Sequence, residues 1–136
     1  MTKELALTAL DDGPVDLIEG ALRLNLTFNS GGAFGIGQDV PGLFLIATVG
    51  IVGTILVVAR KVTDARWLVP LGTVLGGGLG NAYDRVFRDL GGGVVDFIDL
   101  HVWPIFNVAD MAIVTGALVM FVLGWRDKDG EPSVGD

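Results

Sequence analysis

The sequence predicts an all-helical membrane protein of one domain, residues 1–136, with three transmembrane helices and a small extracytoplasmic β element. Hydrophobic residues make up 51% of the chain and charged residues only 18%, whereas soluble domains are usually about a quarter charged. Three long segments are apolar and almost free of charge. A shorter segment with alternating apolar and polar residues precedes the first of them.

The three apolar segments cover residues 42–59, 67–83 and 105–125, and each is long enough to cross a hydrocarbon core. A helix of 18 residues rises about 27 Å, which is close to the thickness of that core. The first two segments carry no charge and the third carries only Asp110, while Pro70 lies in a first turn, where proline is tolerated. The alternative is buried core helices of a soluble protein. It is disfavoured because so short a chain has little polar surface with which to cover three of them.

The basic residues predict how these helices are oriented, since cytoplasmic loops carry an excess of Lys and Arg. They lie between the first two segments and after the third: Arg60, Lys61 and Arg66, then Arg126 and Lys128. The loop between the first two segments and the tail at 126–136 are therefore expected in the cytoplasm. Residues 1–41 and the loop 84–104 are expected on the outer side.

Residues 1–41 are expected to form an extracytoplasmic β and turn region that contains no membrane span. In this region apolar residues alternate with polar ones, a period of two that predicts a strand: Leu22, Leu24, Leu26 and Phe28. The first ten residues contain charges and no long apolar core, so no secretory signal peptide is expected.

The composition argues against several classes of function. The net charge of −7 disfavours nucleic acid as a partner, because phosphate binding needs a basic surface. The chain has no cysteine, which excludes disulfides, thiol nucleophiles and thiolate metal sites. A single histidine, His101, excludes a multi-histidine metal site.

Two aspartates are candidates for chemistry. Asp110 lies six residues into the third apolar segment, where inserting a carboxylate costs about 2.5–3.5 kcal/mol, so it is a functional candidate by default. The alternative is a structural carboxylate paired with an arginine. Asp96 lies between Val95 and Phe97 shortly before that segment, and its alternative is an ordinary loop carboxylate. Two carboxylates in one site of low dielectric constant do not both ionise easily, so one can hold a proton while the other activates water.

A glycine-rich stretch ends the second apolar segment and leads into a polar group. Gly76 and Gly80 are spaced to form a small face for close helix contact, and Asn81, Asp84 and Arg85 follow at the outer end. For the glycines alone, a packing face is the preferred interpretation. A nucleotide-binding loop fits poorly because no strand–turn–helix unit surrounds the glycines.

Four short motifs stand in order along the chain: NSGGAF at 29–34, GGGLGNAYDR at 76–85, VVDF at 94–97 and FNVAD at 106–110. They resemble the blocks NTGAAF, GGxxGNxxDR, VVDF and FNxAD of signal peptidase II, the lipoprotein signal peptidase of bacteria. Each block alone is weak evidence, and NSGGAF by itself is also typical of a simple turn. Four blocks in the same order are highly specific, and the resemblance covers roughly residues 1–125.

The resemblance implies an aspartic endopeptidase that removes the signal peptides of bacterial prolipoproteins before a diacylglyceryl-modified cysteine. Asp96 and Asp110 match the two catalytic aspartates of the family. Other positions match polar residues that line the site and hold the substrate or the acids: Asn29, Asn81, Arg85 and Asn107. Of these, Arg85 is expected to keep one aspartate ionised. Structural roles are expected for Gly77, Gly80 and Asp84.

The resemblance also implies the setting in which the protein works. The family uses no metal or other cofactor and lies in the bacterial cytoplasmic membrane, with its site near the outer leaflet. The expected partners are diacylglyceryl-modified prolipoproteins and membrane lipid, and a monomer is expected.

The chain departs from the family pattern mainly in its first residues. The family usually has four membrane helices, with a first-helix block resembling DQxTK. Here Thr2 and Lys3 stand where that block ends, so most of the first span is expected to be absent. Smaller departures are Ser30, Gly32 and Met111.

Two other functions are compatible with parts of the sequence. A catalytically inactive homologue that binds lipoprotein precursors, or a small membrane scaffold, predicts binding without turnover. A proton-coupled transporter that uses Asp110 is also conceivable, because acids in membranes often relay protons. The other two apolar segments, however, contain no acid or histidine that would continue such a path.

Overall fold

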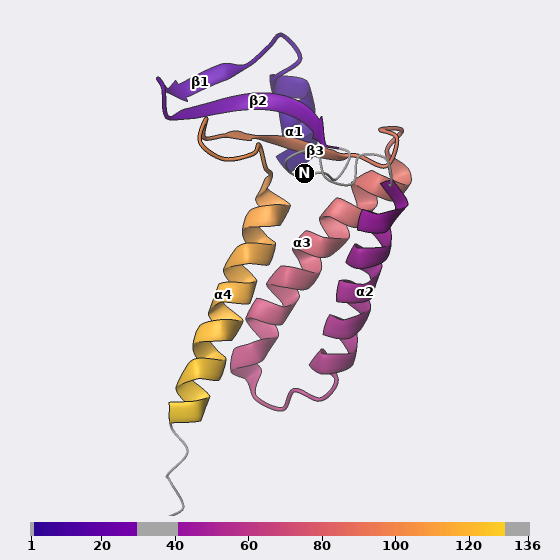
Figure 1. Cartoon of the computed structure of the whole chain (residues 1–136), viewed down its shortest axis with the longest axis vertical. Coiled ribbons are helices and arrows are strands. Elements are labelled where there is room, and N and C mark those ends of the chain that lie inside the picture. Colours follow the sequence, from indigo (N-terminus) through magenta and orange to yellow (C-terminus); the bar gives the residue numbers. More distant parts are fainter. Residues whose placement is uncertain (1, 30–40, 130–136) are drawn as a thin grey trace, which may run out of the picture.

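The computed structural model describes residues 2–29 and 41–129, with the backbone alone for residues 41–44, 128 and 129. Three long helices run side by side, and a small sheet with a short helix lies across one of their ends (Figure 1). The helices, in chain order, are α1 (Thr2–Ala9), α2 (Pro41–Ala59), the 3-10 turn η2 (Ala65–Trp67), α3 (Leu68–Phe87) and α4 (Val108–Asp129). The predicted combination of long helices with a small β element is confirmed.

The helical layer is built around α3, which lies between α2 and α4 (Figure 1). Ile55 of α2 and Leu71 and Val74 of α3 are buried together, and Ile113 and Met120 of α4 pack against them. This small apolar cluster joins the three helices.

Two glycines let α3 and α4 approach closely. A β-carbon on Gly77 would lie only 2.5 Å from the carbonyl oxygen of Ala109, and one on Gly116 would lie 2.6 Å from Cγ2 of Val74. At Gly80 the same construction gives 3.6 Å to the Ala109 β-carbon, an ordinary contact. One of these two close approaches, at Gly77, lies beside the first turn of α4.

Among the described helices, α4 is the one whose length and composition suffice for crossing a membrane. Its residues 108–127 have a mean hydropathy of 1.9. Within the part of α2 whose side chains are described, residues 45–59 form a shorter apolar stretch. Large apolar side chains lie exposed on all three helices, among them Ile46, Val69 and Phe121. Such extensive apolar surface is unusual for a protein surrounded by water.

The sheet is antiparallel, with its strands in the order β1 (Val15–Ile18), β2 (Leu22–Asn29) and β3 (Val94–Asp99). The strand predicted from alternation is β2. In the register of β2 and β3, Thr27 lies opposite Asp96 and Asn29 lies opposite Val94. The end of β2 is thereby held beside one of the candidate aspartates.

The region 1–41, expected to contain only strand and turn, also contains helix α1. Its residues include Ala, Leu, Glu and Lys, which favour helices. Ala6 and the following Leu10, four residues apart, bury themselves against Phe97 of β3. Residues 30–34 of the NSGGAF motif lie outside the described residues, and so does the turn predicted there.

The outer loop expected at 84–104 is also more structured than predicted, since it includes the end of α3 and the whole of β3. The third apolar segment becomes helical only at Val108, because Phe106 pairs with the backbone of Ile98. Asp110 therefore lies about 3 Å past the first residue of α4, and its predicted place six residues into a membrane helix was wrong.

Of the two glycines predicted to form a contact face, Gly80 lies against α4 and Gly76 does not. A β-carbon on Gly76 would meet nothing within 4 Å, whereas Gly80 does lie against α4. The neighbouring Gly77 makes the close contact, because the face of α3 turned toward α4 passes through residues 77 and 80.

Gly77→Ala is expected to destabilise the protein by about 1–3 kcal/mol, the usual cost of overpacking, because a backbone oxygen of α4 would have to move. The measurement is the thermal unfolding midpoint in detergent. Gly76→Ala is the matched control, since it adds the same methyl group to the same helix in open space. Equal midpoints for the two variants would contradict the close packing at Gly77.

Candidate active site

The candidate site is organised where α4 begins. Asn107 directly precedes this helix, and its Oδ1 accepts the backbone N–H groups of Ala109 at 2.7 Å and Asp110 at 3.1 Å. In return, Oδ2 of Asp110 accepts the backbone N–H of Asn107 at 3.0 Å. This reciprocal pattern is a capping box. It fixes the Asp110 carboxylate at the helix N-terminus, where the helix dipole favours a negative charge.

Asn107 also connects the two candidate acids. Its Nδ2 donates to Oδ1 of Asp96 at 2.6 Å, while its backbone holds Asp110. The side chain of Asn107 is fully buried. Since Oδ1 is committed to the helix cap, Nδ2 must face Asp96, so the orientation of the amide is determined by its surroundings.

Asp96 is the more enclosed of the two acids, with 2% of its surface exposed. Its second oxygen accepts Nδ2 of Asn29 at 2.9 Å, across the pair formed by β2 and β3. Burial raises the pKa of Asp96, and the nearby charge of Asp110 acts in the same direction. The two amide hydrogen bonds and the ammonium of Lys3 oppose this rise in pKa without cancelling it.

Asn81 of α3 holds Asp110 from the other side. Its Nδ2 donates to Oδ1 of Asp110 at 2.7 Å. Its Oδ1 accepts from Nδ2 of Asn107 at 3.2 Å and from Nζ of Lys3 at 2.8 Å. With Asn29, three amide side chains and two carboxyl groups therefore form one continuous hydrogen-bonded network.

A cluster of buried charged side chains adjoins this network and is centred on Asp84, which is 1% exposed. Its Oδ2 accepts Nζ of Lys3 at 2.6 Å and the backbone N–H of Val95 at 3.0 Å, and its Oδ1 accepts Nε of Arg88 at 2.7 Å. Arg88 also pairs with Glu4 of α1. Asp84 thus connects α1, α3 and β3.

Arg85 is near the aspartates without pairing directly with them. Its Nη1 lies 3.5 Å from the carbonyl oxygen of Asn81. Within the described part of the chain, Arg85 forms no ion pair with Asp96 or Asp110, and its buried Nε has no hydrogen-bond partner. Its charge still attracts both aspartates at longer range.

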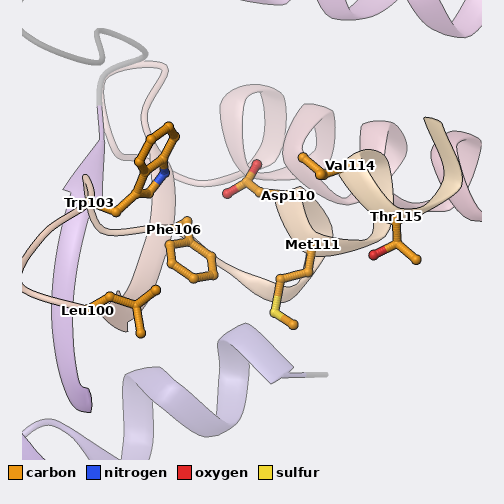
Figure 2. Close-up of a pocket in the computed structure, with 7 residues that line it drawn as sticks. All are labelled: Leu100, Trp103, Phe106, Asp110, Met111, Val114 and Thr115. Atoms are coloured by element: carbon orange, nitrogen blue, oxygen red, sulfur yellow. The ribbon is translucent and has the colours of Figure 1, made fainter. Parts of the chain in front are cut away.

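A cavity of about 390 Å³ opens beside Asp110, and Figure 2 shows the side chains around it. Among the described residues that line it, Asp110 is the single ionisable one, and the others are apolar apart from one threonine: Leu100, Trp103, Phe106, Met111, Val114 and Thr115. The cavity suits an apolar group whose polar end reaches a carboxylate. Within the residues described, no three His, Asp or Glu side chains converge in a way that would hold a metal ion.

The geometry agrees with one known family. The family model for Signal peptidase (SPase) II matches residues 1–126. The chain belongs to this family. The resemblance inferred from the four sequence motifs is therefore confirmed.

Curated relatives of this signal peptidase II family member carry the name lipoprotein signal peptidase. The protein of Rhodococcus jostii is 42% identical over 127 residues, which cover 90% of this chain and 64% of the relative. The protein of Streptomyces griseus is 40% identical over 124 residues, covering 89% of this chain and 63% of the relative. The chain thus spans slightly less than two thirds of the length of these relatives.

Two solved structures, each described as a bacterial membrane enzyme, share the fold. One superposes with a TM-score of 0.84 at 27% sequence identity, covering 99% of this chain and 85% of the other. The second has a TM-score of 0.73 at 30% identity, with coverages of 90% and 81%.

The structure brings most of the residues predicted from this family into one network. It joins the two aspartates and three of the asparagines: Asp96, Asp110, Asn29, Asn81 and Asn107. Asp84 is connected to this network through Lys3, which donates to both Asp84 and Asn81. Arg85 contacts the network through the carbonyl oxygen of Asn81. No role was predicted from the sequence for Lys3, Glu4 or Arg88. The spacing of Asp84 and Arg88, four residues apart on one helix, was the available sign of an ion pair.

The raised pKa of Asp96 predicts how stability depends on pH. A carboxyl group whose folded-state pKa exceeds the unfolded value of about 4 keeps its proton longer in the folded state. Its contribution to stability is present at pH below about 4 and is lost as the pH rises through the folded pKa. Asp96→Asn has no carboxyl group at this position and so lacks this loss of stability. As the pH is raised from about 4 to 8, the unfolding midpoint of Asp96→Asn minus that of the parent chain is therefore expected to increase.

The measurement is the thermal midpoint of both chains across that pH range. Asp89→Asn, at an exposed carboxylate between α3 and β3, is the control and is expected to run parallel to the parent chain. A constant difference between Asp96→Asn and the parent would contradict the raised pKa.

Proposed function

We propose that this chain is an aspartic endopeptidase that removes signal peptides from bacterial prolipoproteins, cutting before the diacylglyceryl-modified cysteine. The observation that carries the proposal is the bridge formed by Asn107, which holds Asp96 and Asp110 in one network beside an apolar cavity. Membership of the signal peptidase II family and the name of its curated relatives support the same activity.

The environments of the two aspartates suggest which one acts as the general base and which one as the general acid. Asp110 lines the cavity and accepts N–H groups from Asn81 and Asn107 at a helix N-terminus, so it is placed to act as the base. Asp96 is more deeply buried, which favours its protonated form, so it acts as the acid.

In the first step Asp110 takes a proton from water while the water oxygen attacks the scissile carbonyl carbon. Asp96 gives its proton to the carbonyl oxygen, which leaves a neutral tetrahedral diol. In the second step Asp110 gives its proton to the departing nitrogen and Asp96 takes a proton from one hydroxyl of the diol. The peptide bond breaks, a carboxylic acid and an amine leave, and both acids return to their starting states.

The proposed membrane arrangement follows the distribution of charge and apolar surface. Helices α2, α3 and α4 are the three spans, and the basic residues at 60–66 and 126–128 lie at the end of the bundle remote from the sheet (Figure 1). By the positive-inside rule that end faces the cytoplasm. The network and the sheet then lie at the outer leaflet of the bacterial cytoplasmic membrane, in a single domain of residues 1–136.

The cavity beside Asp110 supports a substrate that stays partly in the bilayer. It is lined by residues of α4 and of the segment 100–106, and Val114 and Met111 around it are also exposed on the apolar surface of α4. Lipid or a lipid-modified peptide can therefore reach the cavity without crossing water. In line with the family resemblance, we propose that a monomer is the active form and that no metal or other cofactor takes part.

The first test is cleavage of a diacylglyceryl-modified prolipoprotein by the purified chain in detergent, followed by gel shift. The parent chain is expected to release the signal peptide. Asp96→Asn and Asp110→Asn are each expected to lower kcat by about 10²–10⁴, the contribution of a positioned acid or base. Asp89→Asn, outside the network, is the control.

Full activity in either network variant would contradict the paired-acid mechanism. Binding of the precursor by the parent chain without release of the signal peptide would instead favour the inactive homologue.

The role of the cavity is tested by filling it. Val114→Trp is expected to raise KM for the lipid-modified precursor about tenfold with little change in kcat, because it removes binding shared by ground and transition states. Val119→Trp places the same side chain at an exposed valine of α4 that does not line the cavity, and it is expected to keep the parental KM. Equal effects of the two substitutions would contradict substrate binding in this cavity.

A further inference from the structure

Lys3, in the first turn of α1, is a buried cation directly behind the candidate acids. Only 8% of its surface is exposed. Its Nζ donates to Oδ2 of Asp84 at 2.6 Å and to Oδ1 of Asn81 at 2.8 Å, and it lies 3.5 Å from the carbonyl oxygen of Gly80. All three donors of the ammonium group are directed at the outer end of α3.

Neutralising the charge of Asp84 does not by itself explain why the ammonium group of Lys3 makes its contacts with α3. Arg88 already pairs with Oδ1 of Asp84, and the backbone N–H of Val95 donates to Oδ2. Lys3 adds a contact that Arg88 lacks, namely the bond to the neutral amide of Asn81.

That bond determines which way the amide of Asn81 points. An ammonium group only donates hydrogen bonds, so it requires the amide oxygen on its side. The Nδ2 of Asn81 is then turned toward Asp110, to which it donates at 2.7 Å. If the amide turned over, N–H would face the ammonium and a carbonyl oxygen would face the carboxylate, so both contacts would become repulsive.

We propose that Lys3 is a positioning residue for Asp110, acting through the amide of Asn81. This inference rests on the proposed peptidase function. No hydrogen bond joins Lys3 to Asp96 or Asp110. The chain of contacts runs from its ammonium to Oδ1 of Asn81 and from Nδ2 of Asn81 to Oδ1 of Asp110. The same amide oxygen also accepts from Asn107, so the ammonium group helps to hold the bridge between the two acids.

The test is a double-mutant cycle read as kcat and KM for the diacylglyceryl-modified precursor. Lys3→Met is expected to lower kcat about tenfold with little change in KM, because a carboxylate is misplaced while the cavity is intact. In an Asn81→Ala background the same substitution is expected to change kcat by less than about twofold, since its intermediary is gone.

Arg88→Met is the matched control for loss of structure alone. It removes a cation from Asp84 and from Glu4, which loosens α1 as Lys3→Met does, yet it leaves Asn81 untouched. It is expected to lower the thermal midpoint while keeping the parental kcat. Equal losses of kcat in Arg88→Met and Lys3→Met, or independent effects of Lys3 and Asn81, would overturn the proposal.

The absence of cysteine from the chain allows a second variant in case Lys3→Met does not fold. Lys3→Cys gives a unique thiol, which 2-bromoethylamine converts into a side chain with an ammonium at nearly the position of the lysine. Alkylation with 1-bromopropane gives a neutral side chain of the same length. Recovery of kcat with the first reagent alone is expected, and equal kcat after both reagents would overturn the proposal.

If the parent chain does not cleave the precursor, the proposed function is contradicted. Whether Lys3 orients the amide of Asn81 is then tested by a measurement that needs no cleavage. The side-chain amide of Asn81, labelled with ¹⁵N, is expected to be protected from hydrogen exchange in the parent chain. Lys3→Met is expected to remove that protection and Arg88→Met to keep it. Unchanged protection in Lys3→Met would show that Lys3 does not hold the amide.

Discussion

The structure of the site depends on the amide of Asn107, because its two ends are committed to different parts of the fold. Its oxygen accepts the first free N–H groups of α4, which fixes where that helix begins. Its nitrogen donates to Asp96 on β3, which fixes where the sheet lies relative to the helix. A residue that caps a helix therefore also sets the position of one acid, and the capping box sets the position of the other.

Near this amide the protein buries charged side chains, which would destabilise the fold if they were left unpaired. Asp84 is almost completely buried and is matched by Lys3, Arg88 and a backbone N–H of β3. A buried ion pair contributes little net stability, but removing one partner leaves an uncompensated charge, so the arrangement strongly favours a single geometry. The cost of burying Asp84 thus becomes a means of aligning α1, α3 and β3 beside the two acids.

Much of this could be predicted from the sequence, and the omissions have physical causes. The long helices and β2 were predicted because hydrophobicity and period-two alternation are local signals. Asp110 was found because an acid stands out in an apolar segment, although its depth was wrong: hydropathy does not register the pairing of Phe106 with Ile98 that delays α4. Helix α1 and β3 depend on contacts with distant segments. The role of Lys3 was missed for the same reason, since its partners lie 77–81 residues away.

The placement of the site between sheet and bundle answers two opposing requirements. In the proposed mechanism the acid must be shielded from water so that it keeps its proton, whereas the base must be accessible to water and substrate. Asp96 meets the first requirement because β2, β3 and Asn107 enclose it. Asp110 meets the second because the first turn of a helix leaves its carboxylate at the wall of a cavity, supported by N–H donors. A site within the bundle would enclose both acids, and one on the open sheet would expose both. The junction of the two layers separates their environments while one asparagine keeps them together.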